Sequence, residues 1–326
     1  MTSKVRGAKL KTGFLRVGVL MGGWSTERAV SLVSGRKVAE GLRAAGFSTV
    51  VLDLTAKDKD EKKLAARLRA ARMDVAFIAL HGGYGENGGL QALLSRLKIP
   101  YTGSGSLACG LAMQKACAKL VFEANGIATA PWQALEKRKG ANDKRGREVG
   151  LKPPLVVKPA DGGSAIGVTI VRKKEQLDRA LALAFKTSHW VLVEKFIEGV
   201  EVTAGVLREK ALPLIEIVPA NEFYDYDAKY TPGRSKHLIP ARIPAGAARE
   251  ARALAVKAGS VLGCRDFYRV DLIVPKKGGP QVLEVNTVPG MTGTSLFPEA
   301  AAKAGTPFPK LLKQLVVLAL SRKGRD

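Results

Sequence analysis

The strongest constraint on the fold is an alternation of apolar runs and helix-like segments in the first third of the chain. Residues 14–21, 48–54 and 75–80 are apolar runs typical of buried strands. Segments with helical periodicity separate them and predict helices over residues 25–45 and 57–72. Because this alternation favours parallel strands with helices on both faces, we expect a doubly wound α/β domain. Ligands of such domains bind beyond the carboxyl ends of the strands, where the sequence has residues 22–27 and 81–88.

The chain of 326 residues is too long for one ordinary domain. We expect three parts, at residues 1–112, 113–199 and 200–326. The middle part contains two strands that bracket a glycine-rich loop, and the last part is rich in β-branched segments. A continuous helix is expected over residues 107–124. The prediction is therefore an α/β fold in which two α+β parts follow a doubly wound domain.

The chain is strongly basic, with 53 Lys and Arg against 29 Asp and Glu and a formal net charge of +24. Such a charge attracts nucleic acids and anionic membrane surfaces, so a polyanion-binding protein is one hypothesis. The basic residues are spread along the chain without interleaved aromatics, zinc-finger spacing or a basic-zipper pattern. The favoured interpretation is a basic surface without a specific nucleic-acid partner.

Cysteine usage and hydropathy indicate a cytoplasmic protein. The three cysteines form no CxxC pair, and their odd number argues against a disulfide framework. No apolar run reaches the ~18 residues that a membrane-spanning helix needs, so no membrane insertion is expected. No secretory signal pattern follows the basic N-terminus.

A glycine-rich loop at residues 158–167 is a candidate phosphate site. Lys158 ends a predicted strand, and Gly162, Gly163 and Gly167 follow it. Glycines permit backbone conformations in which N–H groups surround a phosphate, and the lysine adds a positive charge. The loop lacks the Gly-Lys-Ser/Thr ending of a Walker A loop. Taken alone, such a loop is more often a simple turn between two strands.

Acidic and amide side chains occupy two predicted strands near the C-terminal end. Arg269 and Asp271 share one face of the first strand, and Glu284 and Asn286 share one face of the next. Pairing of the strands would bring Asp271, Glu284 and Asn286 together as the hard oxygen ligands that Mg²⁺ prefers. Arg269 beside them could stabilise a transferring phosphoryl group. The alternative is two half-exposed strands with a polar face.

Two further residues lie in the loops that follow predicted strands. Glu27 stands after a double glycine, where it could bind an ammonium group or simply favour the first turn of a helix. His81 opens a second glycine loop, a position more suggestive of a site than a helix face, although a lone histidine is usually structural.

Taken in order, these strings resemble those of the D-alanine–D-alanine ligases of the ATP-grasp superfamily. The strings that carry the resemblance are Gly22-Gly23, Glu27-Arg28, His81-Gly82, Lys115, Lys158-Pro159, Gly163-Ser164, Glu194-Lys195-Phe196, Tyr224-Asp225-Tyr226, Arg269-Val270-Asp271 and Glu284-Val285-Asn286. The likeness extends from about residue 17 to residue 320. It implies a three-part ATP-grasp architecture in which two α+β domains clasp ATP, and it implies a homodimer.

The resemblance also implies a role for individual residues. The residues implied to contact ATP are Lys115, Lys158, Gly163, Glu194, Lys195, Ile197 and Glu201. The residues implied to bind two Mg²⁺ (or Mn²⁺) ions are Asp271, Glu284 and Asn286. Catalytic roles fall on Glu27, Ser164, Tyr230, Arg269 and Gly290. Contacts to D-alanine fall on His81, Lys229, Ser295 and Leu296.

The implied reaction joins two D-alanines through a D-alanyl phosphate, as an enzyme of peptidoglycan precursor synthesis. A tyrosine at position 230 goes with D-alanine as second substrate in the family, so the dipeptide is expected. A D-alanine–D-lactate type of ligase is one alternative. A degenerate ATP-grasp protein that binds polyanions is the other, although retention of Arg269, Asp271, Glu284 and Asn286 argues against it.

Overall fold

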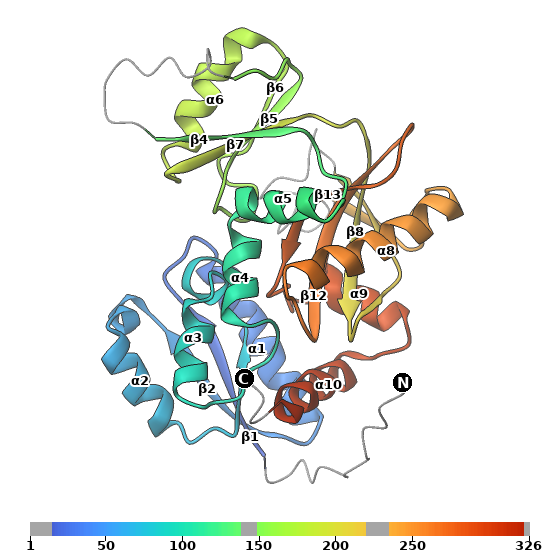
Figure 1. The fold of residues 1–326 in the computed structure, drawn as a ribbon. Helices are drawn as coiled ribbons and strands as arrows, with labels where there is room; N and C mark the ends of the chain where they lie inside the picture. Colours follow the sequence, from blue (N-terminus) through green and yellow to red (C-terminus); the bar gives the residue numbers. More distant parts are fainter. Residues whose placement is uncertain (1–14, 138–148, 220–234, 323–326) are drawn as a thin grey trace.

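The N-terminal strands form a parallel sheet in the order β2–β1–β3, as the alternation predicts. The computed structural model describes residues 15–137, 149–219 and 235–322 (Figure 1). The strands of this sheet are β1 (Arg16–Gly22), β2 (Ser48–Leu54) and β3 (Val75–Ile78).

Helices cover both faces of this parallel sheet. The helices are α1 (Arg28–Ala44), α2 (Glu61–Ala70) and α3 (Gly89–Arg96). Val17 and Val19 lie in one core cluster with side chains of α1, whereas Leu20 and Ile78 lie in another with side chains of α2 and α3. Alternate strand residues therefore point to opposite covered faces, which confirms the doubly wound expectation.

The helix boundaries differ from the sequence prediction where polar side chains compete for the backbone. The predicted start of α1 at Ser25 is wrong, because Ser25 Oγ donates to the carbonyl oxygen of His81 at 2.6 Å. The predicted helix over residues 57–72 is divided into a short 3₁₀ turn, η2 (Ala56–Lys59), and α2. Asp60 separates them by accepting the N–H groups of Lys62 and Lys63.

The continuous helix predicted over residues 107–124 is also wrong. The structure has two helices, α4 (Ser106–Met113) and α5 (Lys115–Ala124), and Gln114 between them has a ψ of 88°. The Lys115 N–H leaves the helical pattern and donates to the carbonyl oxygen of Ala160 at 2.8 Å. This break turns the start of α5 toward the glycine-rich loop.

An antiparallel sheet in the order β4–β7–β5–β6 forms the middle part. Its elements are β4 (Trp132–Glu136), β5 (Leu155–Pro159), β6 (Thr169–Val171), η5 (Lys174–Gln176), α6 (Leu177–Ala184) and β7 (Trp190–Lys195). Buried side chains of α6 cover one face of the sheet. The hairpin predicted around the glycine-rich loop is confirmed, since β5 and β6 pair antiparallel. Strand β4 was not predicted.

The C-terminal sheet has the order β11–β10–β8–β12–β13, with β9 paired to β8. Its elements are β8 (Gly199–Leu207), β9 (Lys210–Ala211), β10 (Ile215–Pro219), β11 (Ser235–Leu238), α8 (Ala245–Val261), β12 (Phe267–Pro275) and β13 (Gln281–Asn286). Helices α5 and α8 pack on one face, where Phe122 and Ala255 join Val202 and Val270.

The last helices return to the beginning of the chain. Helix α9 (Leu296–Lys303) and helix α10 (Phe308–Ser321) follow the C-terminal sheet, and α10 packs beside α1 (Figure 1). A Cβ on Gly41 of α1 would lie 2.6 Å from Leu312 Cδ1, so the two helices approach closely only because residue 41 is glycine. Side chains of the predicted first and third parts therefore share one core cluster.

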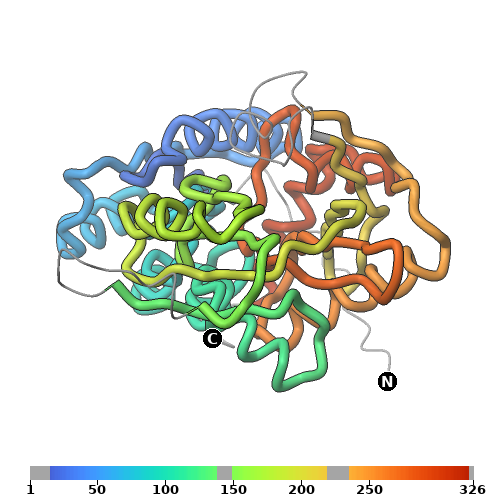
Figure 2. The backbone as a smooth tube through the Cα atoms, turned by 90° about the horizontal axis from the view of Figure 1, so that it is seen from above, coloured from blue at the N-terminus to red at the C-terminus, as the bar shows by residue number. Residues whose placement is uncertain are grey.

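The three groups of elements lie against one another (Figures 1 and 2). Seen from above, the middle part lies across the N-terminal part, and the C-terminal part lies beside both (Figure 2). The division at residues 1–112, 113–199 and 200–326 remains a prediction. Within the described ranges, every helix is too short or too polar to cross a membrane.

We predict that Leu312→Ala destabilises the protein by roughly 2–5 kcal/mol, because it removes a fully buried side chain between α1 and α10. Leu107→Ala deletes the same atoms from a side chain that is 77% exposed, so its effect should stay within about 0.5 kcal/mol. Urea unfolding of both variants measures the difference. Equal losses would contradict the described packing of α10.

Candidate active site

Two adjoining hollows meet between the groups of elements. Both are lined by Lys115, Gly162, Gly163, Ser164 and Glu284, which form a shared wall. One hollow, called the Glu27 end, is further lined by Glu27, His81, Arg269, Asn286, Gly290, Ser295 and Leu296. The other hollow, called the Glu194 end, is further lined by Lys158, Glu194, Lys195, Ile197, Glu201 and Asp271. These are the predicted site residues, except Lys229 and Tyr230, which lie outside the described residues.

Glu27 and Ser164 join the N-terminal part to the loop between β5 and β6. Ser164 Oγ donates a hydrogen bond to Glu27 Oε1, and both side chains are buried. A Cβ on Gly163 would lie 2.9 Å from Glu27 Oε2, which is closer than real Cβ contacts. Glycine at 163 therefore allows the loop to approach the carboxylate.

The left-handed residues of this loop differ from the expectation that its glycines supply them. Ser164 and Ala165 have φ values of 53° and 58°, whereas Gly167 is the only loop glycine with a positive φ. A non-glycine residue in this region costs roughly 1–2 kcal/mol. The hydrogen bond from Ser164 to Glu27 offsets part of that cost.

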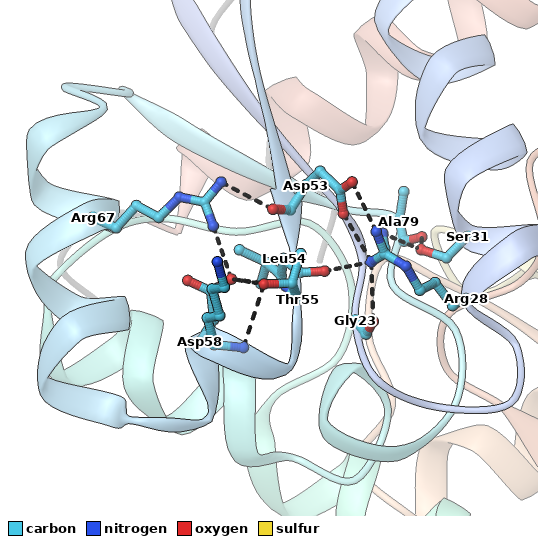
Figure 3. Close-up of polar contacts among 11 residues, drawn as sticks. Gly23, Arg28, Ser31, Asp53, Leu54, Thr55, Asp58, Arg67 and Ala79 are labelled. Carbon is cyan, nitrogen blue, oxygen red and sulfur yellow. Dashed lines mark hydrogen bonds and ion pairs between the residues drawn. The ribbon is translucent and has the colours of Figure 1, made fainter.

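Arg28 fixes the segment that carries Glu27 (Figure 3). Its Nη1 donates to the carbonyl oxygens of Gly23 at 3.0 Å and Leu54 at 2.6 Å, and its Nη2 donates to Asp53 Oδ2 at 2.9 Å. These acceptors lie at the carboxyl ends of β1 and β2. One guanidinium group thus holds together the two strand ends beside Glu27.

Arg67 extends this network to Asp58 (Figure 3). It donates to Asp58 Oδ2 at 2.8 Å and to the carbonyl oxygen of Asp53 at 2.9 Å. Burial by itself raises the pKa of Asp58, but the Thr55 N–H and Arg67 outweigh it and hold that pKa below its usual value. Asp58 therefore remains charged at neutral pH and keeps Arg67 in place.

His81 is buried after β3, and both of its ring nitrogens have partners. Nδ1 lies 3.2 Å from the Val288 carbonyl oxygen, and Nε2 lies 2.9 Å from Ser34 Oγ. Because a carbonyl only accepts, we infer that Nδ1 carries the proton and Nε2 accepts from Ser34. Ser34 Oγ accepts in turn from the Met291 N–H at 3.3 Å. His81 and Ser34 thus link the N-terminal part to the segment that contains Gly290.

Arg269 and Asp271 lie side by side on β12, on the face toward the hollows. Arg269 Nε donates to Asp271 Oδ1 at 2.9 Å, and Nη2 donates to Oδ2 at 2.8 Å. Thr203 Oγ1 donates to Asp271 Oδ1 at 2.6 Å from the neighbouring strand. This two-pronged ion pair fixes the plane of the guanidinium group.

Strand register brings the predicted metal ligands together. Asp271 lies opposite Glu284, and Arg269 lies opposite Asn286. Lys115 Nζ lies 3.3 Å from Glu284 Oε2 and donates to the Gly162 carbonyl oxygen at 2.5 Å. Two carboxylates and an amide oxygen beside a candidate phosphate loop suit a hard divalent cation. Phosphate oxygens would supply the remaining ligands of such a cation. Among the described residues, no three His, Cys, Asp or Glu side chains converge as a metal cluster.

A buried charge cluster lies at the Glu194 end, where Glu194 and Lys158 line the hollow and Lys119 lies behind them. Glu194 of β7 lies between two lysines, with Oε1 2.9 Å from Lys119 Nζ and Oε2 2.8 Å from Lys158 Nζ. Burial by itself raises the pKa of Glu194, but Lys158 and Lys119 outweigh it and hold that pKa below its usual value. Burial also lowers the pKa of Lys119, although Glu194 opposes this change. We conclude that Glu194 is ionised.

The rest of the Glu194 end is mainly apolar. Ala130, Val156, Ile170 and Leu283 line it together with the predicted residues Ile197 and Glu201. Lys195 Nζ donates to the Lys152 carbonyl oxygen at 3.0 Å, so this predicted residue is anchored to the segment before β5. An apolar slot with a few polar groups at its edge suits a flat heteroaromatic ring.

The start of α9 lines the Glu27 end. Ser295 is the N-cap residue of this helix, and its Oγ accepts from the Thr292 N–H at 2.9 Å. A Cβ on Gly290 would lie 2.7 Å from Ser295 Oγ, so the two predicted residues are in close contact. The first N–H groups of a helix, with Leu296 at its first position, favour a bound carboxylate.

Sequence reasoning missed Lys119 and Ser34, both of which contact predicted site residues. Lys119 follows Lys115 by four residues, so both lysines face the same side of α5. Like charges at this spacing are unfavourable unless acidic side chains lie near them. The spacing of the two lysines could therefore have indicated an acidic partner for Lys119. Ser34 lies in the middle of a helix, and no sequence pattern distinguishes it from a surface serine.

Comparison with known proteins gives one family. A family model for the D-ala D-ala ligase C-terminus matches residues 121–317, and a model for the D-ala D-ala ligase N-terminus matches residues 54–104. A D-alanine–D-alanine ligase of Pelotomaculum thermopropionicum is 48% identical over 95% of this chain and 98% of its own length. One from Geotalea uraniireducens is 46% identical over 93% of this chain and 95% of its own length.

Solved structures agree with the sequence relatives. A D-alanine–D-alanine ligase from Bacillus anthracis has a TM-score of 0.82 and 37% identity, covering 95% of this chain and 99% of its own. The ligase from the same organism complexed with ATP has a TM-score of 0.81 and 34% identity over the same shares. Family models that span most of the chain and relatives with nearly half of their residues identical lead to one conclusion: this chain belongs to the D-alanine–D-alanine ligase family.

Proposed function

We propose that this chain joins two D-alanines to D-alanyl-D-alanine and converts ATP to ADP and phosphate. The observation that carries the proposal is the shared wall between the two hollows. There, the glycine-rich loop and Lys115 lie between the buried Glu27 carboxylate and the hollow that contains Glu194. A phosphate on this wall would be within reach of groups bound at either end.

The Glu194 end is the proposed ATP site. Its apolar slot would hold adenine against Glu194, Lys195 and Ile197, and Glu201 would bind the ribose. The triphosphate would then extend to Lys158, Lys115 and the N–H groups around Gly163. Two lysines and a loop of N–H donors neutralise phosphate charge without a Walker A loop.

Asp271, Glu284 and Asn286 would hold Mg²⁺, whose chemistry is to neutralise charge on the phosphates during transfer. The support is their chemistry and the register that sets Asp271 opposite Glu284. The cations now beside these carboxylates, Arg269 and Lys115, would remain near the transferring group.

The first D-alanine would bind at the Glu27 end, with its ammonium group on Glu27 and its carboxylate toward the shared wall. His81 would close this pocket from the side of β3. A carboxylate oxygen attacks the γ-phosphorus of ATP, the bond to the bridging oxygen breaks, and ADP leaves. Because the resulting D-alanyl phosphate hydrolyses in water, the contact between Ser164 and Glu27 is suited to keep the site closed.

The second D-alanine would place its carboxylate at the start of α9, on Ser295 and the Leu296 N–H. Its uncharged amine attacks the acyl carbon. The tetrahedral intermediate loses a proton from nitrogen to the departing phosphate as the carbon–oxygen bond breaks, which leaves the peptide bond. Arg269 and the Gly290 N–H would stabilise the oxyanion. Both lie around the Glu27 end, close to the start of α9.

Lys229 and Tyr230 complete the proposal from outside the described residues. Lys229 would contact substrate, and Tyr230 would join Glu27 and Ser164 and favour an amine over D-lactate as second substrate. Cytoplasmic location, a homodimer and the three-domain division also belong to this proposal. Light scattering on the purified protein tests the dimer.

The proposed reaction predicts phosphate release from Mg-ATP that requires D-alanine, with one dipeptide formed per phosphate. L-alanine should give no release, and D-lactate added to D-alanine should compete poorly near neutral pH. A coupled phosphate assay with chromatography of the product measures both. Folded, ATP-binding protein without D-alanine-dependent release would refute the proposed function, and an excess of D-alanyl-D-lactate would refute the specificity.

We predict that Gly163→Ala lowers kcat/KM for D-alanine by about tenfold to a hundredfold, because the new methyl group would displace Glu27. Gly150→Ala is the matched control, since its Cβ would meet no atom within 4 Å and its φ is not positive. Steady-state kinetics on both variants give the comparison. Equal kinetics for Gly163→Ala and the control would contradict the close approach of loop and carboxylate.

A further inference from the structure

Glu194 is shared by two lysines that differ in their access to the cleft. Lys158 lines the Glu194 end beside the glycine-rich loop, whereas Lys119 lies behind Glu194, is 1% exposed and does not line the hollow. The two lysines bind different oxygens, Oε2 and Oε1, at 2.8 and 2.9 Å. Lys119 can therefore keep its oxygen when Lys158 moves.

Lys119 is fixed by contacts beyond Glu194. Its Nζ donates to Thr129 Oγ1 and lies 3.4 Å from the Ala130 carbonyl oxygen. Thr129 Oγ1 donates in turn to the Val282 carbonyl oxygen of β13 at 2.8 Å. Lys119 is thus held between the middle part and the strand that carries Glu284, and no contact ties it to the glycine-rich loop among those described.

A buried carboxylate needs at least one cation beside it. Glu194 is 2% exposed, so water solvates its carboxylate poorly and a neighbouring lysine stabilises its charge. If Lys158 were its only partner, moving Lys158 to a phosphate would leave a buried negative charge unpaired. With Lys119 in place, the carboxylate keeps a partner and the move leaves no charge unpaired.

We propose that Lys119 is a positioning residue that acts as the permanent counter-ion of Glu194 and so frees Lys158 to transfer from Glu194 to a nucleotide phosphate. The inference rests on the proposed function, because it requires a nucleotide at this end of the cleft. It assigns the cluster a task beyond holding adenine. In the structure Lys158 pairs with Glu194, and phosphate binding would exchange the partner of Lys158.

The exchange predicts which part of a nucleotide Lys119 helps to bind. The phosphate benefit is defined as the dissociation constant of adenosine divided by that of Mg-ADP. In Lys119→Met, Lys158 stays with Glu194, so the phosphate benefit should fall by about tenfold to a hundredfold. Adenosine affinity itself should change little. Displacement of a fluorescent ATP analogue from the full-length protein measures both constants.

A charge-neutralising variant distinguishes this role from a structural one. In Lys119→Met with Glu194→Gln, no carboxylate retains Lys158, so the phosphate benefit should return to within about threefold of wild type. Glu194→Gln alone should keep or raise the benefit, although it alters adenosine affinity. Replacing both members of a buried ion pair with neutral groups of similar size is usually tolerated in folding.

Two results would overturn the inference. One is that Lys119→Met weakens adenosine and Mg-ADP by the same factor, as loss of pocket shape would do. The other is that the double variant keeps the reduced phosphate benefit. If Lys119→Met does not fold, a lower benefit in Glu194→Gln than in wild type would overturn it instead. If wild-type protein binds no Mg-ADP, the proposed function is overturned as well. If wild-type protein binds Mg-ADP and Lys119→Met has the same phosphate benefit as wild type, only the role of Lys119 is refuted.

Discussion

The glycine-rich loop depends on two side-chain contacts that reach it from opposite sides. Ser164 donates to Glu27 of the N-terminal part, and Lys115 donates to the Gly162 carbonyl oxygen while facing Glu284 of the C-terminal sheet. The loop is therefore the place where all three groups of elements meet. Because the two hollows share this wall, its position affects whether a phosphate at one end can reach a carboxylate at the other.

Charges in the cleft are compensated by one another. Arg269 pairs with Asp271, Lys115 with Glu284, and Lys158 with Glu194. Each pair joins a cation suited to phosphate with an acid suited to a metal ion or to adenine. Burying such groups singly would be costly, so mutual pairing stabilises the cleft. Anionic and cationic ligands that arrive together can exchange these partners without leaving a charge unpaired.

The sequence predicted what depends on local periodicity and strand geometry. The parallel order of β1 to β3, the hairpin around the glycine-rich loop and the shared face of Arg269 and Asp271 all follow from the spacing of residues along strands. Most residues of the Glu27 end were predicted from the family resemblance. Periodicity could not group them, because they lie on separate segments of the chain. What was missed depends on contacts between distant segments. The break at Gln114 arises from a bond to Ala160, and the importance of Lys119 arises from Glu194, which lies on another element.

In the proposed reaction, one cleft activates the carboxylate of D-alanine by phosphorylation before the peptide bond forms. D-alanine labelled with ¹⁸O in its carboxylate tests this most directly, with mass spectrometry of the released phosphate. One ¹⁸O atom is expected in each phosphate, because the oxygen that attacks ATP leaves with the phosphoryl group. Dipeptide formed with unlabelled phosphate would contradict it, since the carboxylate would then have been activated by another route.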